Sequence, residues 1–373
     1  MASSETESLR PSPTPGVVAR VAGMAVFVVG LVAYMQVNGL PRQGYQVVII
    51  LWLATVAWDV RRPMREHLAF LRDWWPPFAV LLLYLYSRGV SDNLGILDVS
   101  FTWPIEADRW LFGGTLPTEY LQAHLCGVPC RQSLQPRWYD VVLTTVYYSH
   151  FFAALAVGAV LWKRNRPAWI GYMRRYLAIM LLSVAGYILY PMAPPWMAAR
   201  DGYLTGDVAR ITGRGWFDLT ASSRSVTAST ETTAQQDLSS IGNQVAAMPS
   251  LHSALAIFIA WWVVSHFRTP WRWTVLLYPA SMLFALVYYA EHYVVDEIAG
   301  ALLVVVVMVA WGWWDRRRRK SQEASLETSQ ETSPDQETEP AWDTISSASR
   351  SGASSGMKCA TPSSTTSSNP PEQ

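Results

Sequence analysis

Charged residues are scarce in this sequence. Asp, Glu, Lys and Arg make up only 15% of its 373 residues, whereas 51% are hydrophobic and 13% aromatic. Such a composition is typical of a multi-pass membrane protein and not of a soluble domain. The formal net charge is only +1, and no basic patch with interleaved aromatic residues occurs. Both observations argue against a nucleic-acid partner.

Several familiar signatures are also missing. The sequence has no glycine-rich loop of the kind that cradles nucleotide phosphates. It has no visible internal repeat, although transporters commonly have one. A transporter that binds a lipid headgroup in transit is therefore a less favoured alternative. The first apolar stretch is long and lacks a clear A-x-A cleavage site, so we do not expect a cleaved signal peptide.

Long apolar runs are what the sequence has instead. They predict an all-α integral membrane protein with about eight transmembrane helices. The runs lie near residues 21–38, 44–60, 74–90, 139–161, 173–192, 249–267, 271–290 and 293–314. We expect residues 21–315 to form one membrane domain, with long outer loops at 91–138 and 193–248.

Basic residues in the short loops predict the orientation of these spans. With an even number of spans, every basic cluster falls on the same side as both termini, which the positive-inside rule places in the cytoplasm. The clusters contain Arg61, Arg62, Arg65, Arg72, Lys163, Arg164, Arg166, Arg174, Arg175, Arg268, Arg272 and the RRRRK run at 316–320. Residues 1–20 and 316–373 flank the membrane domain. They are rich in Ser, Thr, Glu and Pro, and we expect them to be disordered.

The stretch HYVVDEIAG, residues 292–300, places ionisable side chains at the mouth of the last apolar run. Such groups are costly near a membrane, which favours a functional role. His292 and Asp296 share one helical face, and the Asp296 side chain leans toward His292. The carboxylate can hold one ring nitrogen as N–H and leave the other as a nucleophile or base. The alternative is that His292 and Asp296 only satisfy each other's hydrogen-bonding groups at a helix end and have no role in chemistry.

A second stretch, AAMPSLHSALAIF at 246–258, places His252 at the same outer face. Pro249 suits a first helical turn, and Ser250 is a plausible cap. Helix N-termini favour bound phosphate, so two helix starts that each carry a His could face one pocket. One His would attack phosphorus while the other protonates the leaving oxygen.

MPSLHSA and HYVVDEIAG resemble the second and third motifs of the type 2 phosphatidic acid phosphatase superfamily. YPMAPPWMA (190–198) and ADRWLFGGTLPTEYLQ (107–122) are similar to the branch of fungal inositol phosphorylceramide synthases and their bacterial relatives. The resemblance spans roughly residues 90–305. It implies a six-helix phosphatase-type core and metal-independent chemistry without a cofactor.

The resemblance also implies a role for each of three residues. His292 would be the nucleophile that forms a phosphohistidine, Asp296 would orient it, and His252 would be the general acid. Two elements that normally grip phosphate are missing, namely the first motif and the Ser-Arg that opens the third, where this chain has Ala285-Leu286. Replacement phosphate ligands from the outer loop could be Arg200, Arg210, Arg214 or Arg224, and the alternative for each is a solvated loop residue. Ser250 and Ser253 are further candidate substrate-binding residues.

Other polar residues allow two interpretations each. His150, in the fourth span, could contact substrate or be hydrogen-bonded for packing. Glu291 could tune the pKa of His292 or contact a polar headgroup, or it could be exposed to water without a role. Cys126 and Cys130 face an oxidising compartment in this topology and could form a local disulfide. With His124 they offer three potential zinc ligands, but no fourth is evident.

The sequence therefore predicts a membrane enzyme that acts on a phospholipid or polyprenyl-phosphate substrate at the outer face of the plasma membrane. If a second lipid or sugar hydroxyl resolves the phosphohistidine, the enzyme is a phosphotransferase, with phosphatidylinositol as one possible donor. If water resolves it, the enzyme is a lipid-phosphate or polyprenyl-diphosphate phosphatase. The intact His252, His292 and Asp296 argue against an inactive scaffold.

Overall fold

The computed structural model describes residues 15–38, 44–94, 98–131, 135–204, 208–215 and 247–331. Within these ranges the chain is helical, apart from loops and one isolated bridge between Ser100 and Met192. The predicted all-α fold is therefore confirmed. The chain divides into two units, residues 1–318 and 319–373. Of the second unit only residues 319–331 are described, as the end of the last helix.

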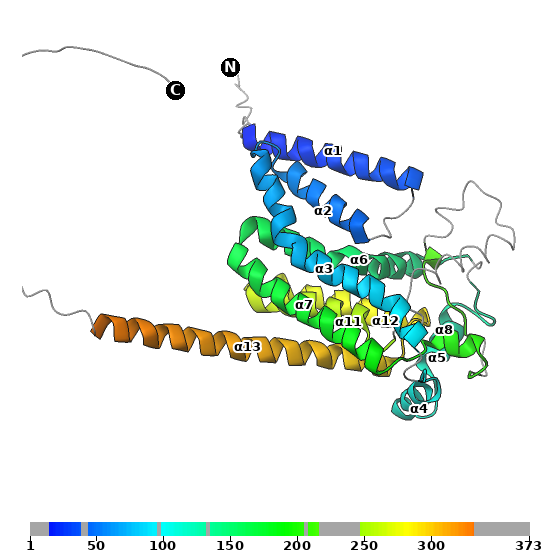
Figure 1. Ribbon diagram of the computed structural model, residues 1–373. Coiled ribbons are helices and arrows are strands. Elements are labelled where there is room, and N and C mark those ends of the chain that lie inside the picture. The colour runs from blue at the N-terminus through cyan, green and yellow to red at the C-terminus, as the bar shows by residue number, and fades with distance from the viewer. Residues whose placement is uncertain are drawn as a thin grey trace, which may run out of the picture. The chain divides into compact units, whose positions relative to one another are not determined.

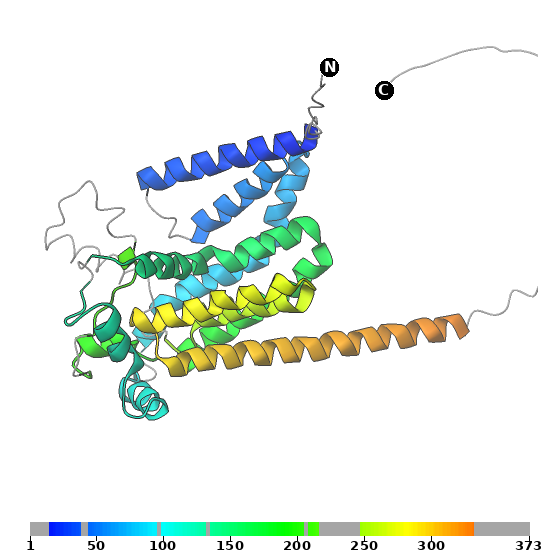
Figure 2. The ribbon, with the colours of Figure 1, turned by 180° about the vertical axis from the view of Figure 1, so that it is seen from behind.

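Each predicted apolar run lies on a helix. These helices are α1 (Pro15–Asn38), α2 (Gly44–Trp58), α3 (Met64–Leu94), α6 (Trp138–Arg164), α7 (Arg166–Leu189), α11 (Leu251–His266), α12 (Leu277–Tyr288) and α13 (Val294–Glu331). A 3₁₀ helix, η1 (Pro270–Leu276), precedes α12. In the first unit α1, α2, α3, α7, α6, α11 and α12 lie side by side (Figures 1 and 2).

Fewer helices than eight meet a length-and-hydropathy test for a membrane span. Among the described residues, Gly16–Asn38, Arg166–Leu189 and Val294–Thr328 meet it. The two halves of α6 add a fourth if their 57° bend is a break within one span. Helices α2 and α11 are apolar but have only 15 and 16 residues, short of the roughly 20 that a full span needs. The eight-span topology stays a prediction.

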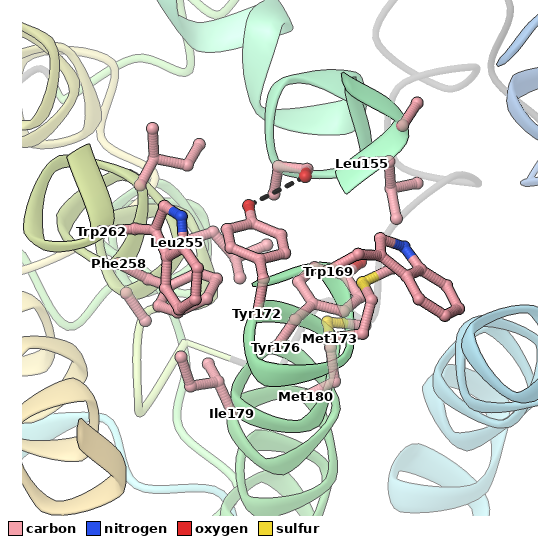
Figure 3. Close-up of a cluster of buried hydrophobic side chains, with 14 of the residues drawn as sticks. Leu155, Trp169, Tyr172, Met173, Tyr176, Ile179, Met180, Leu255, Phe258 and Trp262 are labelled. Atoms are coloured by element: carbon pink, nitrogen blue, oxygen red, sulfur yellow. Dashed lines mark hydrogen bonds between the residues drawn. The ribbon is translucent and has the colours of Figure 1, made fainter. Parts of the chain in front are cut away.

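The core that supports the site is built around one face of α7. Trp169, Tyr172, Met173, Tyr176 and Met180 recur along that helix at the three- and four-residue spacing of a single face and are buried. They pack with Leu155 of α6 and with a face of α11 that includes Leu255, Phe258 and Trp262 (Figure 3). The Tyr172 hydroxyl donates a hydrogen bond of 2.8 Å to the Ala154 carbonyl. This packing fixes α11, whose first turn carries His252.

The predicted outer loops contain short helices of their own. They are α4 (Thr102–Leu111), α5 (Pro117–Leu125) and α8 (Pro195–Arg200). Figure 1 shows all three at the end of the first unit where α12 ends and α13 begins. The predicted disordered tail at 316–373 begins inside α13, because that helix continues to Glu331. Likewise α1 begins at Pro15, within the predicted disordered segment 1–20.

Candidate active site

A tight turn between α12 and α13 carries His292. Ala290 has φ 62°, a left-handed conformation that costs energy for a residue with a side chain. The backbone N–H groups of Glu291 and His292 both donate to the Leu286 carbonyl, at 3.0 and 3.3 Å. In the first turn of α13, the Asp296 carboxylate accepts a hydrogen bond of 2.9 Å from Nδ1 of His292. Nε2 of His292 is thereby left as the basic nitrogen.

His252 lies opposite that nitrogen, at the start of α11. Ser250 is the N-cap of this helix, since its Oγ accepts the N–H of Ser253 at 3.4 Å. Nδ1 of His252 lies 3.4 Å from Nε2 of His292, and the two ring centroids are 5.4 Å apart. His292 and Asp296 are 5% and 0% exposed, so the pair is largely shielded from water. The structure thus brings together the three residues predicted to be catalytic.

The two histidine-bearing helix starts are joined directly. The Ser250 N–H donates to the Asp296 backbone carbonyl at 3.0 Å. One turn further along α13, a Cβ atom on Gly300 would lie 2.5 Å from the Ser250 carbonyl oxygen. Only glycine allows the helices to approach this closely at that position. The distance between the histidines is therefore fixed by backbone contacts and not by side chains alone.

Two rings of α6 lie beside His252. The His150 ring is 4.0 Å from it, centroid to centroid, and the Tyr147 ring stacks on it at 5.2 Å. His150, for which the sequence allows a substrate contact or a packing role, lies beside His252 in the structure; its contact with substrate stays a prediction. Tyr147 is not among the predicted site residues. Its spacing of three residues from His150 on the same helix is the signal that could have found it.

An arginine from the second predicted outer loop contacts Glu291, the residue before His292. Arg210 donates from Nε to Oε1 of Glu291 at 2.7 Å and from Nη2 to Oε2 at 3.2 Å. Thr212 donates to the same carboxylate. The Arg210 guanidinium lies 4.7 Å above the Trp196 ring of α8. Burial alone would lower the pKa of Arg210, but the charge and hydrogen bonds of Glu291 outweigh it and raise that pKa.

The other predicted phosphate ligands are engaged elsewhere. Arg200 is exposed and pairs with Asp201 at 2.6 Å. Arg214 is 1% exposed and donates to the Gln135 carbonyl at 3.0 Å, beside the buried Asp140. The Ser253 hydroxyl donates to the Ser250 carbonyl at 3.1 Å, within the helix start. Arg224 lies outside the described residues.

The two cysteines of the first predicted outer loop are joined, as the sequence allowed. Cys126 and Cys130 form a disulfide, as predicted, and Nη1 of Arg214 lies 2.7 Å from the Cys126 sulfur. His124, the third potential zinc ligand, bonds through Nδ1 with the Tyr120 carbonyl of its own helix. Among the residues that the structure describes, no group of His, Cys, Asp and Glu is arranged to hold a metal ion.

Asp108 of α4 is a site residue that sequence reasoning missed. Its two carboxylate oxygens accept the backbone N–H groups of Val294 and Val295, at 2.9 and 3.0 Å. Burial raises the pKa of the Asp108 carboxyl, and the two hydrogen bonds oppose that shift. These first N–H groups of α13 therefore already have a partner, although free N–H groups at a helix start are what the sequence analysis expects to favour a phosphate.

Comparisons with known proteins agree with the two motifs. Residues 128–310 match the family model described as the PAP2 superfamily. The chain is 24% identical over 242 residues to a phosphoinositol dihydroceramide synthase of Bacteroides thetaiotaomicron, a match that covers 60% of this chain and 71% of that protein. No solved structure matches. The predicted resemblance, including its synthase-like branch, is confirmed.

Proposed function

We propose that this protein is a membrane enzyme that transfers a phospho-headgroup from a lipid through a phosphohistidine at the outer face. The match of residues 128–310 to the PAP2 superfamily model supports this proposal. One observation carries the proposal. Nε2 of His292, with Nδ1 held by Asp296, faces the ring of His252 across 3.4 Å. A nucleophile, its orienting carboxylate and a proton donor are the groups that such a transfer requires.

In the first step the Nε2 lone pair of His292 attacks phosphorus. The bond from phosphorus to the lipid oxygen breaks, and protonated His252 gives its proton to that oxygen, so the lipid leaves as an alcohol. The His292 ring becomes positively charged when the new bond forms. Asp296 stabilises this charge, because its carboxylate already accepts the Nδ1 hydrogen at 2.9 Å.

In the second step an acceptor hydroxyl attacks the same phosphorus. His252, now neutral, takes the hydroxyl proton, and the phosphorus–nitrogen bond breaks to return His292 to its starting state. A lipid or sugar hydroxyl gives transfer, whereas water gives hydrolysis. The alternative function, a lipid-phosphate or polyprenyl-diphosphate phosphatase, would use the same residues with a different substrate and with water as the acceptor.

Arg210 is the arginine that we propose as a phosphate ligand. Glu291 holds its Nε and Nη2, and no other hydrogen bond to Arg210 is found in the described part of the chain. Its Nη1 donors therefore stay available to a substrate. Its partner Glu291 directly precedes His292, which places the Arg210 side chain beside the segment that carries the proposed nucleophile. Ser250, Ser253, Arg200 and Arg214 are less suitable because other contacts use them.

The choice of transfer as the leading function comes from the named relative. A phosphoinositol dihydroceramide synthase at 24% identity makes phosphatidylinositol the first donor to test and a ceramide-type lipid alcohol the first acceptor. We also propose the plasma membrane as the location, with both termini in the cytoplasm. The disulfide between Cys126 and Cys130 supports an outer, oxidising side for that loop.

The test is product analysis by mass spectrometry. Purified protein is incubated with phosphatidylinositol or undecaprenyl diphosphate, with and without dihydroceramide, and His292→Ala is the control. Diacylglycerol plus a new phosphoinositol lipid, only with acceptor, supports transfer. Release of inorganic phosphate without acceptor supports the phosphatase. Turnover by His292→Ala equal to wild type would overturn both. The scheme contains no metal-dependent step, so a chelator should not change the rate.

A further inference from the structure

Asp108 and the start of α13 form an unusual connection between distant parts of the chain. The carboxylate comes from α4, 186 residues before the Val294 N–H group that it accepts. Asp108 is fully buried, so the two N–H donors replace water as its partners. The positive end of the α13 dipole also favours a negative charge at that position. Asp108 thus caps the N-terminus of α13, although it is remote from that helix in the sequence.

This cap lies at the point where α13 positions the site. Asp296 follows Val294 by two residues, within the same helical turn, and its carboxylate orients His292. Because Asp108 accepts two consecutive N–H groups, it fixes both the position of that turn along the helix axis and its rotation about the axis. A shift of the turn would move the Asp296 carboxylate relative to His292 and the His292 ring relative to His252.

The segment that carries Asp108 is held in place by packing and by backbone hydrogen bonds. Ile105 of α4 packs in a buried cluster with Leu116, Met192 and Tyr293. Just before α4, Ser100 donates to the Pro191 carbonyl at 3.0 Å and accepts from the Ala193 N–H at 3.1 Å. Asp108 is therefore a rigidly placed group, not a surface carboxylate that swings onto the helix.

We propose that Asp108 is a positioning residue for the His292–Asp296 pair, and this inference rests on the proposed function. Because Asp108 occupies the first N–H groups of α13, it also leaves recognition of the substrate phosphate to groups outside that helix start, Arg210 among them. Loss of the Asp108 charge should therefore slow the chemical step and leave substrate affinity nearly unchanged.

The test compares Asp108→Asn with Glu106→Gln, a matched change two residues away at an exposed position of α4. Asparagine keeps the shape of aspartate but replaces one acceptor oxygen with an N–H₂ group. We expect Asp108→Asn to lower kcat about 10- to 100-fold with KM within about twofold of wild type. Glu106→Gln should keep wild-type values of both constants. Phosphohistidine formation in a single turnover should slow by the same factor as kcat.

A second variant removes a donor and leaves the carboxylate in place. Val294→Pro deletes one of the two N–H groups at the first helical position, where proline is tolerated. We expect its kcat to fall about 10-fold at unchanged KM. Wild-type kcat in Asp108→Asn would overturn the inference. So would a loss in that variant that only accompanies unfolding in detergent and is not reproduced by Val294→Pro.

Failure of this inference is distinguishable from failure of the proposed function. If His292→Ala is inactive while Asp108→Asn and Val294→Pro match wild type, the catalytic scheme stands and the positioning role falls. If His292→Ala is active, the scheme itself falls, and with it the basis for the inference.

Discussion

The N–H of Ser250 donates to the backbone carbonyl of Asp296 across 3.0 Å, so the segments that carry the two histidines touch through their main chains. Gly300 makes this possible, because any side chain at that position would meet the Ser250 carbonyl. The geometry of the histidine pair therefore depends on a residue that has no side chain and takes no part in chemistry.

Gly300→Ala is expected to destabilise the protein and reduce its activity. Its Cβ would lie 2.5 Å from the Ser250 carbonyl oxygen and 2.9 Å from the Ser253 Oγ, so α11 and α13 would have to separate. Overpacking of this kind costs about 1–3 kcal/mol. The matched control is Gly312→Ala in the same helix, where the nearest atom is the end of the Arg316 side chain at 3.6 Å. Thermal unfolding in detergent should show a lower midpoint for Gly300→Ala only.

Asp296→Asn should keep the fold but lose most of the turnover. The amide can accept the Nδ1 hydrogen of His292 but brings no charge to stabilise the positive ring, and it can also hold the wrong tautomer. A loss of about 10⁴ in kcat is the scale known for this change in a histidine–carboxylate pair. The measurement is steady-state kinetics with the substrate that the product analysis identifies. A loss below tenfold would contradict the orienting role.

The loss of turnover rate in His252→Gln should depend on the leaving group of the substrate. A lipid alkoxide needs a proton as it leaves, whereas an activated aryl phosphate leaves without one, and general acid catalysis contributes about 10²–10⁴ in rate. We therefore expect a large loss with the lipid and a small loss with the aryl phosphate. Equal losses on both substrates would remove His252 from the role of general acid.

Arg210 and Glu291 should behave as a coupled pair. Arg210→Ala removes a phosphate ligand and leaves the Glu291 carboxylate, 10% exposed, without its cation, so KM should rise and stability should fall. The double variant Arg210→Ala/Glu291→Gln should recover stability but not KM. A double-mutant cycle on both quantities separates the two effects. If the double variant also regains wild-type KM, Arg210 is a structural partner of Glu291 and not a phosphate ligand.

Thiol labelling tests the orientation. The chain has three cysteines, and Cys126 and Cys130 are joined, which leaves Cys359, outside the described residues, as the one expected free thiol. A membrane-permeant maleimide should label one site in intact cells, and Cys359→Ser should abolish the label. An impermeant maleimide should label nothing until the cells are opened. Labelling of intact cells by the impermeant reagent would place the C-terminus outside.

The histidine pair could be predicted because its signals are local. His292 and Asp296 are four residues apart on one helix, and His252 follows a proline and a capping serine at another helix start. Each segment resembles a known motif by itself. The position of His150 beside His252 could not be predicted in this way, since a histidine within an apolar helix can face any neighbour.

The remaining parts of the site come from contacts that no local pattern records. The Asp108 carboxylate meets a helix start 186 residues later, and Arg210 meets Glu291 81 residues later. The choice among the candidate arginines depended on which carboxylate lay near each of them. The sequence does not show the breaks within an apolar run: α12 has only 12 residues and reaches the length of its predicted span only with η1 and the turn after it.

The separation between Asp108 and Val294 has a consequence for synthesis of the chain. At about 5–20 residues per second, the ribosome needs about 10–40 s to make the 186 residues between them. For that time the Asp108 carboxylate has no helix start to cap, and it must remain in water, since burial of an unpaired charge is costly. Helix α4 therefore cannot reach its final position until the start of α13 has been made. A chain cut short before its last helix would keep His292 but lack Asp296 and both N–H partners of Asp108, so the site cannot assemble before the start of α13 has been made.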